Sequence, residues 1–422
     1  MKILWIVNGL LNKFSLYLFN KPANGVWMDA LLSDFRDKAD YEVIVATTIK
    51  TKKTIKYSES NITYYALPDN LPILYNANKK SNIIAWKTLI EAEKPDLIQV
   101  WGTEFNHGLC ALRVAGNIPS VIYIQGCVGA IARYYQAGMP YNELKKTVTF
   151  RDIVKRDSVL QQQKKFFKQS FNEAEMLRLA GRIICENDWC EINLRSVVPD
   201  LKVYRCPLSI NKVFFDYRWY MDKAEKFSLI CTAPGYTIKG LHVLLHAMAL
   251  LKPKYPEIKL YIPGSIKISD GKLKNFIRKD GYTKYIEKLI KKFDISQNVV
   301  WLGNVSQETL AKEYAKHRVF VMPSAIENHS SSLKEAMIVG LPSISSYVGG
   351  IPEYVRHGET GFLYRFEEYE VLAYYISRLF DDDKLAQKIS ENAKKDIVDL
   401  HGGMQLFNRI TEIYKDIVCI EY

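Results

Sequence analysis

The sequence predicts an α/β protein made of two doubly wound domains that face each other across a central cleft. Three observations lead to this prediction. Short apolar runs alternate with amphipathic, helix-like stretches, the alternation occurs in two separate series, and a proline-containing join at 206–211 lies between them. Such alternation is typical of parallel sheets with helices on both faces, and 422 residues suffice for two such domains.

The first series predicts an N-terminal domain over residues 1–206. Its buried strands are expected at Ile3–Val7, Glu42–Ala46, Leu97–Val100, Val121–Ile124 and Arg182–Cys185, with helices such as Gly25–Arg36 and Ile83–Glu93 between them. The apolar run at the start of the chain resembles a signal peptide only superficially. Because it is short, is interrupted by Asn8 and lacks a small-residue cleavage site, we expect it to be the first strand.

The second series predicts a C-terminal domain over residues 207–404. Its strands are expected at Leu229–Thr232, Lys259–Ile262, Val299–Leu302, Val319–Met322 and Ser343–Ser345. The helices between them are expected at Lys239–Leu251, Tyr282–Lys292, Gln307–His317 and Ser332–Val339. Ligands of doubly wound domains bind beyond the carboxyl ends of the strands, so the residues that follow these strands are the candidates for a site.

The segment that begins at Pro323 carries the strongest functional signal. A serine cluster there opens a helix, so that Glu327 and Glu335 flank a helix N-terminus, whose unpaired N–H groups suit a phosphate. If all eight intervening steps were helical, the two carboxylates would be roughly 12 Å apart, about the reach of a nucleotide-diphosphate sugar. An alternative stays open, in which Ser332 and Glu335 form a capping box and Glu327 is a solvated loop acid.

Residues 323–361 resemble the donor-site signature of the family 4 retaining nucleotide-sugar glycosyltransferases, which have the GT-B fold of two Rossmann-like domains. The matching elements are Glu327, Glu335-Ala336-Met337, Gly340-Leu341-Pro342, Gly349-Gly350-Ile351-Pro352-Glu353 and Gly358-Glu359-Thr360-Gly361. The resemblance is close over residues 229–380 and looser before residue 210. It implies that a last helix, at about 405–422, returns to the N-terminal domain.

The resemblance also implies the roles of donor-binding residues. Glu335 would hold the ribose diol, Glu327 the donor-sugar hydroxyls, and Val305 with its neighbours the base. The diphosphate would be held by the helix start, with Asn328, Ser330, Ser331 and Ser332, and by Lys239, a fixed cation that stabilises charge on the departing group. Lys239 in isolation would be read as a solvated lysine in the first turn of a helix.

The chain departs from the family pattern beside this lysine. Many relatives carry an arginine about five residues earlier, where this chain has Ala233-Pro234-Gly235-Tyr236. A second cation is therefore missing or comes from elsewhere. Gly235 would let its backbone approach the diphosphate instead.

The N-terminal domain is expected, from the same resemblance, to hold the acceptor. Relatives place a histidine after the strand that ends at Ile124, and this chain has Gln125, which cannot act as a base but can orient a hydroxyl. Glu104 and His107 follow the preceding strand and are further acceptor-side candidates, although a histidine there is equally explained by packing. Gly25 lies in a turn-like Asn-Gly pair that resembles the family's glycine loop near the diphosphate.

We predict no metal and no cofactor. His242 and His246 have the spacing of a zinc-binding helix but lack the intervening glutamate and a third ligand. Asp381-Asp382-Asp383 mimics a manganese-binding motif but lies between two helices, where a turn and a helix cap are expected. The seven cysteines show no paired framework and are expected to pack as small apolar side chains.

The charge of the chain is concentrated in one segment. Basic residues outnumber acidic ones by 58 to 46, and eight bases fall within 145–168 against Asp152 and Asp157 alone. Large apolar side chains interleave with these bases, a pattern that suits an anionic membrane surface, with an ordinary solvated helix as the alternative. No nucleic-acid recognition motif is present. Since no apolar run approaches the ~18 residues of a spanning helix, we expect a cytoplasmic protein, or one on the cytoplasmic face of the inner membrane.

These observations together predict a metal-independent, retaining glycosyltransferase. It would move a hexose or N-acetylhexosamine from a UDP- or GDP-sugar to a polysaccharide or lipid-linked saccharide acceptor in bacterial surface-glycan biosynthesis. Two alternatives remain open. One is a nucleotide-sugar epimerase of the same fold, which needs no acceptor. The other is a catalytically degenerate subunit that supports a partner transferase, which the missing arginine and histidine suggest.

Overall fold

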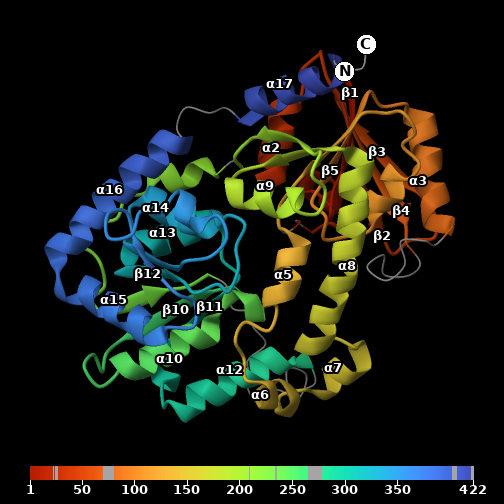
Figure 1. Ribbon diagram of the computed structural model, residues 1–422. Helices are drawn as coiled ribbons and strands as arrows, with labels where there is room; N and C mark the ends of the chain where they lie inside the picture. The colour runs from red at the N-terminus through yellow and green to blue at the C-terminus, as the bar shows by residue number, and fades with distance from the viewer. Residues whose placement is uncertain are drawn as a thin grey trace. The chain divides into compact units, whose positions relative to one another are not determined.

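The computed structural model describes residues 1–21, 23, 27–69, 80–208, 210–232, 235–264, 278–401 and 406–419 (Figure 1). The chain divides into two compact units. The N-terminal unit comprises Met1–Gly129, Phe166–Ser209 and Met404–Tyr422, and the C-terminal unit comprises Ala130–Lys165 and Ile210–Gly403. The segment 130–165 therefore groups with the C-terminal residues, whereas the sequence prediction kept all of 1–206 in one domain.

The N-terminal unit is built on an eight-stranded sheet with the order β3-β4-β2-β1-β5-β6-β7-β8. All neighbouring strands are parallel except β3 and β4, which are antiparallel. The strands are β1 (Lys2–Ile6), β2 (Glu42–Ile49), β3 (Ile55–Glu59), β4 (Ile62–Pro68), β5 (Leu97–Trp101), β6 (Ser120–Tyr123), β7 (Arg182–Cys185) and β8 (Lys202–Arg205). Each of the five predicted strands is present, and the β3–β4 hairpin is an addition that the prediction missed.

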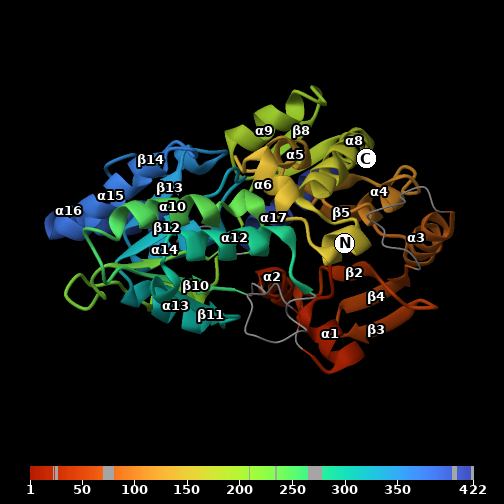
Figure 2. The ribbon, with the colours of Figure 1, turned by 90° about the horizontal axis from the view of Figure 1, so that it is seen from below.

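Helices cover this sheet. They are α1 (Asn12–Phe19), α2 (Trp27–Phe35), α3 (Lys80–Glu93), α4 (His107–Leu112), α9 (Asp188–Arg195) and α17 (Leu406–Cys419), together with parts of α5 (Val128–Tyr134) and α8 (Val159–Ala180). Helix α1 packs on the β3–β4 hairpin, where the rings of Tyr17 and Tyr57 stack 4.4 Å apart (Figure 2). Helix α17 packs on α2, and Trp5 of β1 donates a hydrogen bond to the Tyr414 hydroxyl at 3.1 Å.

The C-terminal unit has a six-stranded, fully parallel sheet with the order β11-β10-β9-β12-β13-β14. The strands are β9 (Ser228–Ile230), β10 (Lys259–Pro263), β11 (Val299–Gly303), β12 (Val319–Met322), β13 (Ser343–Ser346) and β14 (Phe362–Tyr364). The helices are α6 (Tyr141–Lys146), α7 (Phe150–Lys155), α10 (Leu241–Leu251), α12 (Gly281–Lys292), α13 (Gln307–Lys316), α14 (Ser331–Val339), α15 (Tyr369–Asp381) and α16 (Asp383–His401). Helices α10 and α15 pack together on one face of the sheet, and α13, α14 and α16 on the other (Figure 1).

Each sheet has one topological switch point, where consecutive strands depart in opposite directions. In the N-terminal unit the chain runs outward from β1 through β2 on one side and returns to β5 on the other. In the C-terminal unit the same reversal occurs between β9 and β12. Loops on the two sides of a switch point separate, so the carboxyl ends of these strands are where an α/β sheet receives its ligand.

The structure contains no helix that could cross a bilayer, within the part of the chain that it describes. All seven cysteines are free thiols. Six of them are buried, as expected for small apolar side chains, and Cys419 is exposed.

Candidate active site

The switch point of the C-terminal unit brings together a cation and a carboxylate. The Lys239 ammonium lies 2.5 Å from Oε1 of Glu327, although the two residues are 88 positions apart in sequence. Lys239 ends a short 3-10 turn, Thr237–Lys239, that follows β9, and Glu327 lies in the loop that follows β12. The two strands flank the switch point, so the predicted lysine and first glutamate meet where the topology favours a ligand.

Gly240 permits the turn that carries Lys239 to lie close to the end of β12. The predicted helix Lys239–Leu251 instead begins at Leu241, because Gly240 has a φ of +70°, a left-handed conformation that breaks the turn from the helix. A Cβ at this position would lie 1.6 Å from the carbonyl oxygen of Pro323. Gly240 therefore lets the turn carrying Lys239 touch the end of β12, and the Ala325 N–H donates to the Ile238 carbonyl at 2.7 Å.

The Glu327 side chain is held in place from two directions. Its carboxylate is almost buried, with 9% of its surface exposed, and the Ser324 hydroxyl donates to Oε1 at 2.7 Å. Its backbone carbonyl is packed against Gly349, whose φ is +55° and where a Cβ would lie 1.6 Å from that oxygen. The two-glycine element of the motif is thus required by the close approach of the two loops.

The serine cluster forms the N-terminus of α14. The helix is not capped by Ser332, as the capping-box alternative required. Ser330 is the N-cap, and its hydroxyl accepts a hydrogen bond from the Leu333 N–H at 3.3 Å. The proposed capping box of Ser332 with Glu335 is therefore wrong, because Glu335 lies in the second turn of the helix. The estimate of roughly 12 Å between the carboxylates also does not apply, because the chain is helical only from Ser331.

Glu335 is a half-buried carboxyl group on α14. Burial raises its pKa to about 7, with no other cause contributing to the shift. Its negative charge in turn helps to raise the pKa of the nearby buried Tyr314, although burial is the larger cause. No donor among the described residues forms a hydrogen bond with this carboxylate, and its side chain is partly open to solvent. A group of this kind is suited to accept hydrogen bonds from a hydroxyl-bearing ligand.

The other predicted donor-side residues lie on loops beyond the strand ends. Asn328 and Ser330 are buried, Ser332 is half-buried and Ser331 is exposed at the start of α14. Val305 is half-buried after β11, and Gly235 is exposed ahead of the turn that carries Lys239. Gly25 falls outside the described residues.

At the switch point of the N-terminal unit lies the carboxylate of Glu104, which forms no ion pair with a described residue. Glu104 follows β5 and Asn8 follows β1, and the Asn8 side-chain amide donates to Oε2 of Glu104 at 3.4 Å. The backbone of Gly126, after β6, also donates to the carboxylate. Burial raises the pKa of Glu104 to about 7, and the charge of Glu173 adds to the shift. The neighbouring Gln125 follows β6 and is half-buried.

Glu173 and Asn8 were missed by the sequence prediction. Glu173 is a buried residue of α8 that accepts hydrogen bonds from the Thr103 hydroxyl at 2.7 Å and from the N–H groups of Val128 and Gly129 at 2.9 and 3.0 Å. It thereby caps the start of α5 and joins it to the segment that carries Glu104. A polar residue directly after a buried strand is a recognisable signal for Asn8, whereas nothing in the sequence around position 173 marks a buried acid.

His107 is part of the packing rather than of an open site. It begins α4, is 3% exposed, and lies between the rings of Trp86 and Phe105, whose centroids are 6.4 and 5.8 Å away. Burial lowers its pKa to about 4, so the imidazole is neutral near pH 7. The structure therefore favours the packing explanation of this histidine.

The two metal-like patterns are engaged in other contacts. Both ring nitrogens of His242 have partners, the Tyr282 hydroxyl at 3.1 Å and the Ala137 carbonyl at 2.8 Å. Asp382 caps α16 by accepting the Leu385 N–H at 2.9 Å. The described residues contain no group of three or more His, Cys, Asp or Glu side chains that could hold a metal ion.

Comparison with known proteins finds a family match within the C-terminal unit. Residues 221–396, which lie within the C-terminal unit, match the family model described as glycosyl transferases group 1. Over this segment the chain is similar to group 1 glycosyltransferases. The matched segment contains Lys239, Glu327 and Glu335. An uncharacterised glycosyltransferase of Methanocaldococcus jannaschii is 29% identical over 177 residues. That match covers 42% of this chain and 42% of the relative, so less than half of the relative's length is spanned.

Solved structures similar to the whole chain show its fold. Sucrose-phosphate synthase from Thermosynechococcus elongatus has a TM-score of 0.72 at 18% identity, with 100% of both chains covered. The Anabaena protein HepE in complex with UDP and glucose has a TM-score of 0.67 at 16% identity, over 99% of this chain and 100% of the other. The chain accordingly has the GT-B fold, with two Rossmann-like domains as predicted.

Proposed function

We propose that this protein is a retaining glycosyltransferase that transfers a hexose or N-acetylhexosamine from a UDP- or GDP-sugar to a polysaccharide or lipid-linked saccharide. The contact between Lys239 and Glu327 at the β9/β12 switch point carries the proposal. A lone ammonium would serve any phosphate, and a lone carboxylate would serve any sugar. A sugar linked to a diphosphate needs a cation for its phosphates and a hydrogen-bond acceptor for its hydroxyls. The contact of Lys239 with Glu327, in the loop before α14, offers both groups in one place.

The donor is held by groups of matching chemistry. The Lys239 ammonium and the first N–H groups of α14, which have no intrahelical acceptor, bind the diphosphate. Glu327 accepts hydrogen bonds from the donor-sugar hydroxyls, and Glu335 accepts them from the ribose diol. Val305 and its neighbours contact the base, and the backbone of Gly235 approaches the diphosphate. UDP in the HepE complex supports a nucleotide diphosphate as the ligand class.

The transfer step needs no metal in this scheme. The bond from the anomeric carbon to the diphosphate oxygen breaks, and the acceptor oxygen forms a bond to the same carbon on the same face. The acceptor proton passes to the departing diphosphate, whose developing charge is stabilised by Lys239 and the α14 terminus. The protein side chains position the substrates and stabilise the charge on the diphosphate. The departing diphosphate itself acts as the base.

The acceptor is held by the N-terminal unit. Glu104 and Gln125 follow neighbouring strands at the switch point of that sheet and offer a carboxylate and an amide to a hydroxyl-rich ligand. A pKa of about 7 lets Glu104 accept a hydrogen bond when ionised and donate one when protonated. This chemistry suits a saccharide, whose hydroxyls do both.

A ligand screen followed by a product assay tests the proposal. Thermal unfolding is measured with UDP-, GDP- and ADP-sugars, and we expect the midpoint to rise with one UDP- or GDP-sugar. NMR of the donor with candidate saccharides then follows the anomeric signal, with and without a chelator, which should not change the rate. Isomerised donor in the absence of acceptor would indicate an epimerase. Nucleotide binding with neither transfer nor isomerisation would indicate a degenerate subunit, and both outcomes contradict the proposal.

A further inference from the structure

Helix α7 presents an apolar face to solvent. Phe150, Ile153 and Val154 are 74%, 64% and 65% exposed. They are spaced i, i+3 and i+4, so they share one face of the helix. Scattered exposed apolar residues are ordinary on a protein surface, but three large ones on a single helix of six residues are a concentrated patch. We call these three residues the α7 face.

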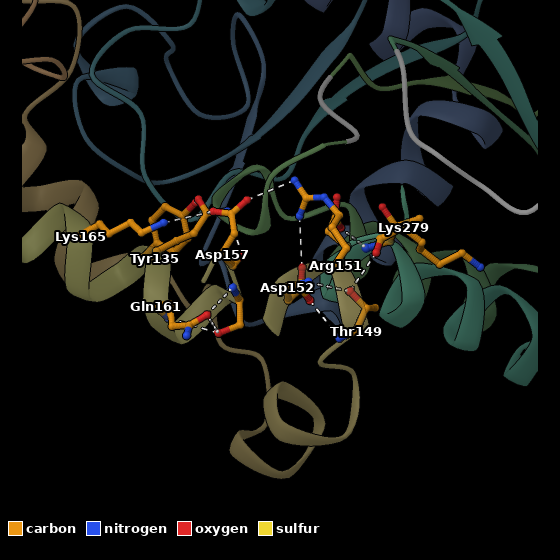
Figure 3. A network of polar contacts seen from close by, with 12 residues as sticks. Tyr135, Thr149, Arg151, Asp152, Asp157, Gln161, Lys165 and Lys279 are labelled. Atoms are coloured by element: carbon orange, nitrogen blue, oxygen red, sulfur yellow. Dashed lines mark hydrogen bonds and ion pairs between the residues drawn. The ribbon is translucent and has the colours of Figure 1, made fainter. Parts of the chain in front are cut away.

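The opposite side of α7 is fixed by polar contacts, which Figure 3 shows. Asp152 is fully buried and forms a capping box with Thr149, so the helix start is closed. The Thr149 hydroxyl also donates to the Lys279 carbonyl at 2.9 Å, just before α12 begins. Arg151 pairs with Asp152 at 3.2 Å and with Asp157 at 3.1 Å. The α7 face is therefore held outward by a network on the other side of the helix.

Exposed bases lie close to the α7 face along the chain. Lys145 and Lys146 end α6, Lys155 ends α7 and Arg156 follows it, and all four side chains are exposed. The acids of the same stretch are engaged elsewhere: Glu143 pairs with Lys288 at 2.6 Å, while Asp152 and Asp157 pair with Arg151. The four bases form no ion pair with a described residue, so this exposed stretch of the chain carries unpaired positive charge.

We propose that the α7 face and its four bases dock the protein on an anionic lipid bilayer. Aromatic and aliphatic side chains would enter the boundary between headgroups and acyl chains, and the bases would contact anionic headgroups. A second copy of this chain would place four like charges against four others, and a neutral or cationic partner would leave them unpaired. Charge complementarity therefore favours an anionic lipid surface. The proposal does not depend on the proposed sugar transfer.

The test is flotation of the full-length protein with vesicles. We expect recovery with vesicles of phosphatidylcholine and phosphatidylglycerol, little recovery with phosphatidylcholine alone, and release at high salt. Each base near an anionic surface is worth roughly a factor of five in partitioning, so the double substitution Lys155→Gln and Arg156→Gln should weaken binding about twenty-fivefold. The triple substitution Phe150→Ser, Ile153→Ser and Val154→Ser should weaken it by at least tenfold.

Matched controls make these losses specific. Leu250→Ser removes an exposed leucine of α10, and Lys384→Gln with Lys388→Gln removes two exposed charges of α16; both should float like the unmodified protein. The triple variant should keep its thermal unfolding midpoint, because its side chains are exposed. Equal recovery of the unmodified protein from neutral and anionic vesicles, or unchanged flotation of the triple variant, would overturn the proposal. So would a dimer in solution that the triple variant no longer forms.

Discussion

The two switch points of this chain have the same topology and opposite electrostatics. At β9/β12, a lysine lies against a carboxylate in the loop that precedes the nine-residue helix α14. At β1/β5, Glu104 has an amide neighbour and a second acid, Glu173, close enough to raise its pKa. The first arrangement is suited to a ligand with negative charge. The second repels anions and is suited to a neutral ligand rich in hydroxyls.

A glycine with positive φ lies beside each site, and here too the two differ. A Cβ on Gly240 would meet the Pro323 backbone oxygen at 1.6 Å, whereas a Cβ on Gly102, with φ of +90°, would meet the end of the Glu104 side chain at 2.2 Å. Gly240 therefore sets the position of the backbone. Gly102 makes room for a side chain. The comparison shows that the same fold can hold one site rigidly through its main chain and the other through a movable carboxylate.

The largest effect is expected from removing the ammonium that contacts Glu327 in the proposed diphosphate site, by Lys239→Ala. Removing one charge-stabilising group from an active site typically costs about a hundredfold to a thousandfold in turnover, so kcat should fall by that amount. UDP affinity should fall while affinity for uridine, which has no phosphate, stays unchanged. Lys254→Ala is the matched control, because that lysine pairs with Asp381 on the surface and should have no effect.

The double variant separates two roles of Lys239. If the lysine only neutralises Glu327, then Glu327→Gln added to Lys239→Ala should restore UDP binding, because the neutral amide needs no cation. If the lysine holds the diphosphate, as we propose, UDP binding stays weak in the double variant. Recovery of affinity would therefore contradict the assignment. Glu327→Gln alone should strongly lower turnover and leave the fold intact.

The second effect compares the two glycines. Gly240→Ala should destabilise the protein by about 2 kcal/mol or more, because a left-handed residue gains a Cβ where the neighbouring backbone atom cannot easily move. Gly102→Ala should cost about 1 kcal/mol, since the side chain of Glu104 can rotate away. Chemical denaturation measures both values. Equal losses at the two positions would show that the acceptor-side carboxylate is as fixed as the donor-side backbone.

The third effect concerns the acceptor. Glu104→Gln keeps the shape and removes the charge, so the KM for the saccharide should rise about tenfold while UDP affinity is unchanged. The control is Glu175→Gln, an acid of α8 whose bidentate partner is Arg113 at the surface. A change in UDP affinity in the Glu104 variant, with the acceptor KM unaltered, would place this residue on the donor side.

The sequence carried enough information for the fold and for the meeting of Lys239 with Glu327. Buried strands such as β1 and β12 are continuous apolar runs, and a parallel sheet with covered faces needs such runs, so their positions were predictable. The β3–β4 hairpin was missed because β3 is half-exposed and rich in polar residues. Its neighbours in the sheet, and not its own composition, make it a strand.

Local choices and long-range contacts could not be predicted. Three consecutive serines offer three possible N-caps, and only packing selects Ser330. The segment 130–165 joins the C-terminal unit through contacts such as the Thr237 hydroxyl with the Tyr135 carbonyl at 2.6 Å, for which the sequence has no periodic signal. The raised pKa values of Glu104 and Glu335 likewise come from burial, which depends on residues far along the chain.

The smallest effect is expected at Glu335, and it depends on pH. A ribose diol donates hydrogen bonds to the ionised carboxylate, so binding favours the form that has lost its proton. Because the pKa of Glu335 is about 7 in the unliganded protein, UDP affinity should fall as the pH drops below about 7, by at most about tenfold per unit, and should level off above it. Glu335→Gln should weaken binding several-fold at high pH and remove the dependence on its titration. UDP lacking both ribose hydroxyls is the matched ligand, because its phosphates titrate like those of UDP. If the affinities of the two nucleotides change with pH in parallel, Glu335 does not contact the diol, and the donor site has been placed at the wrong end of α14.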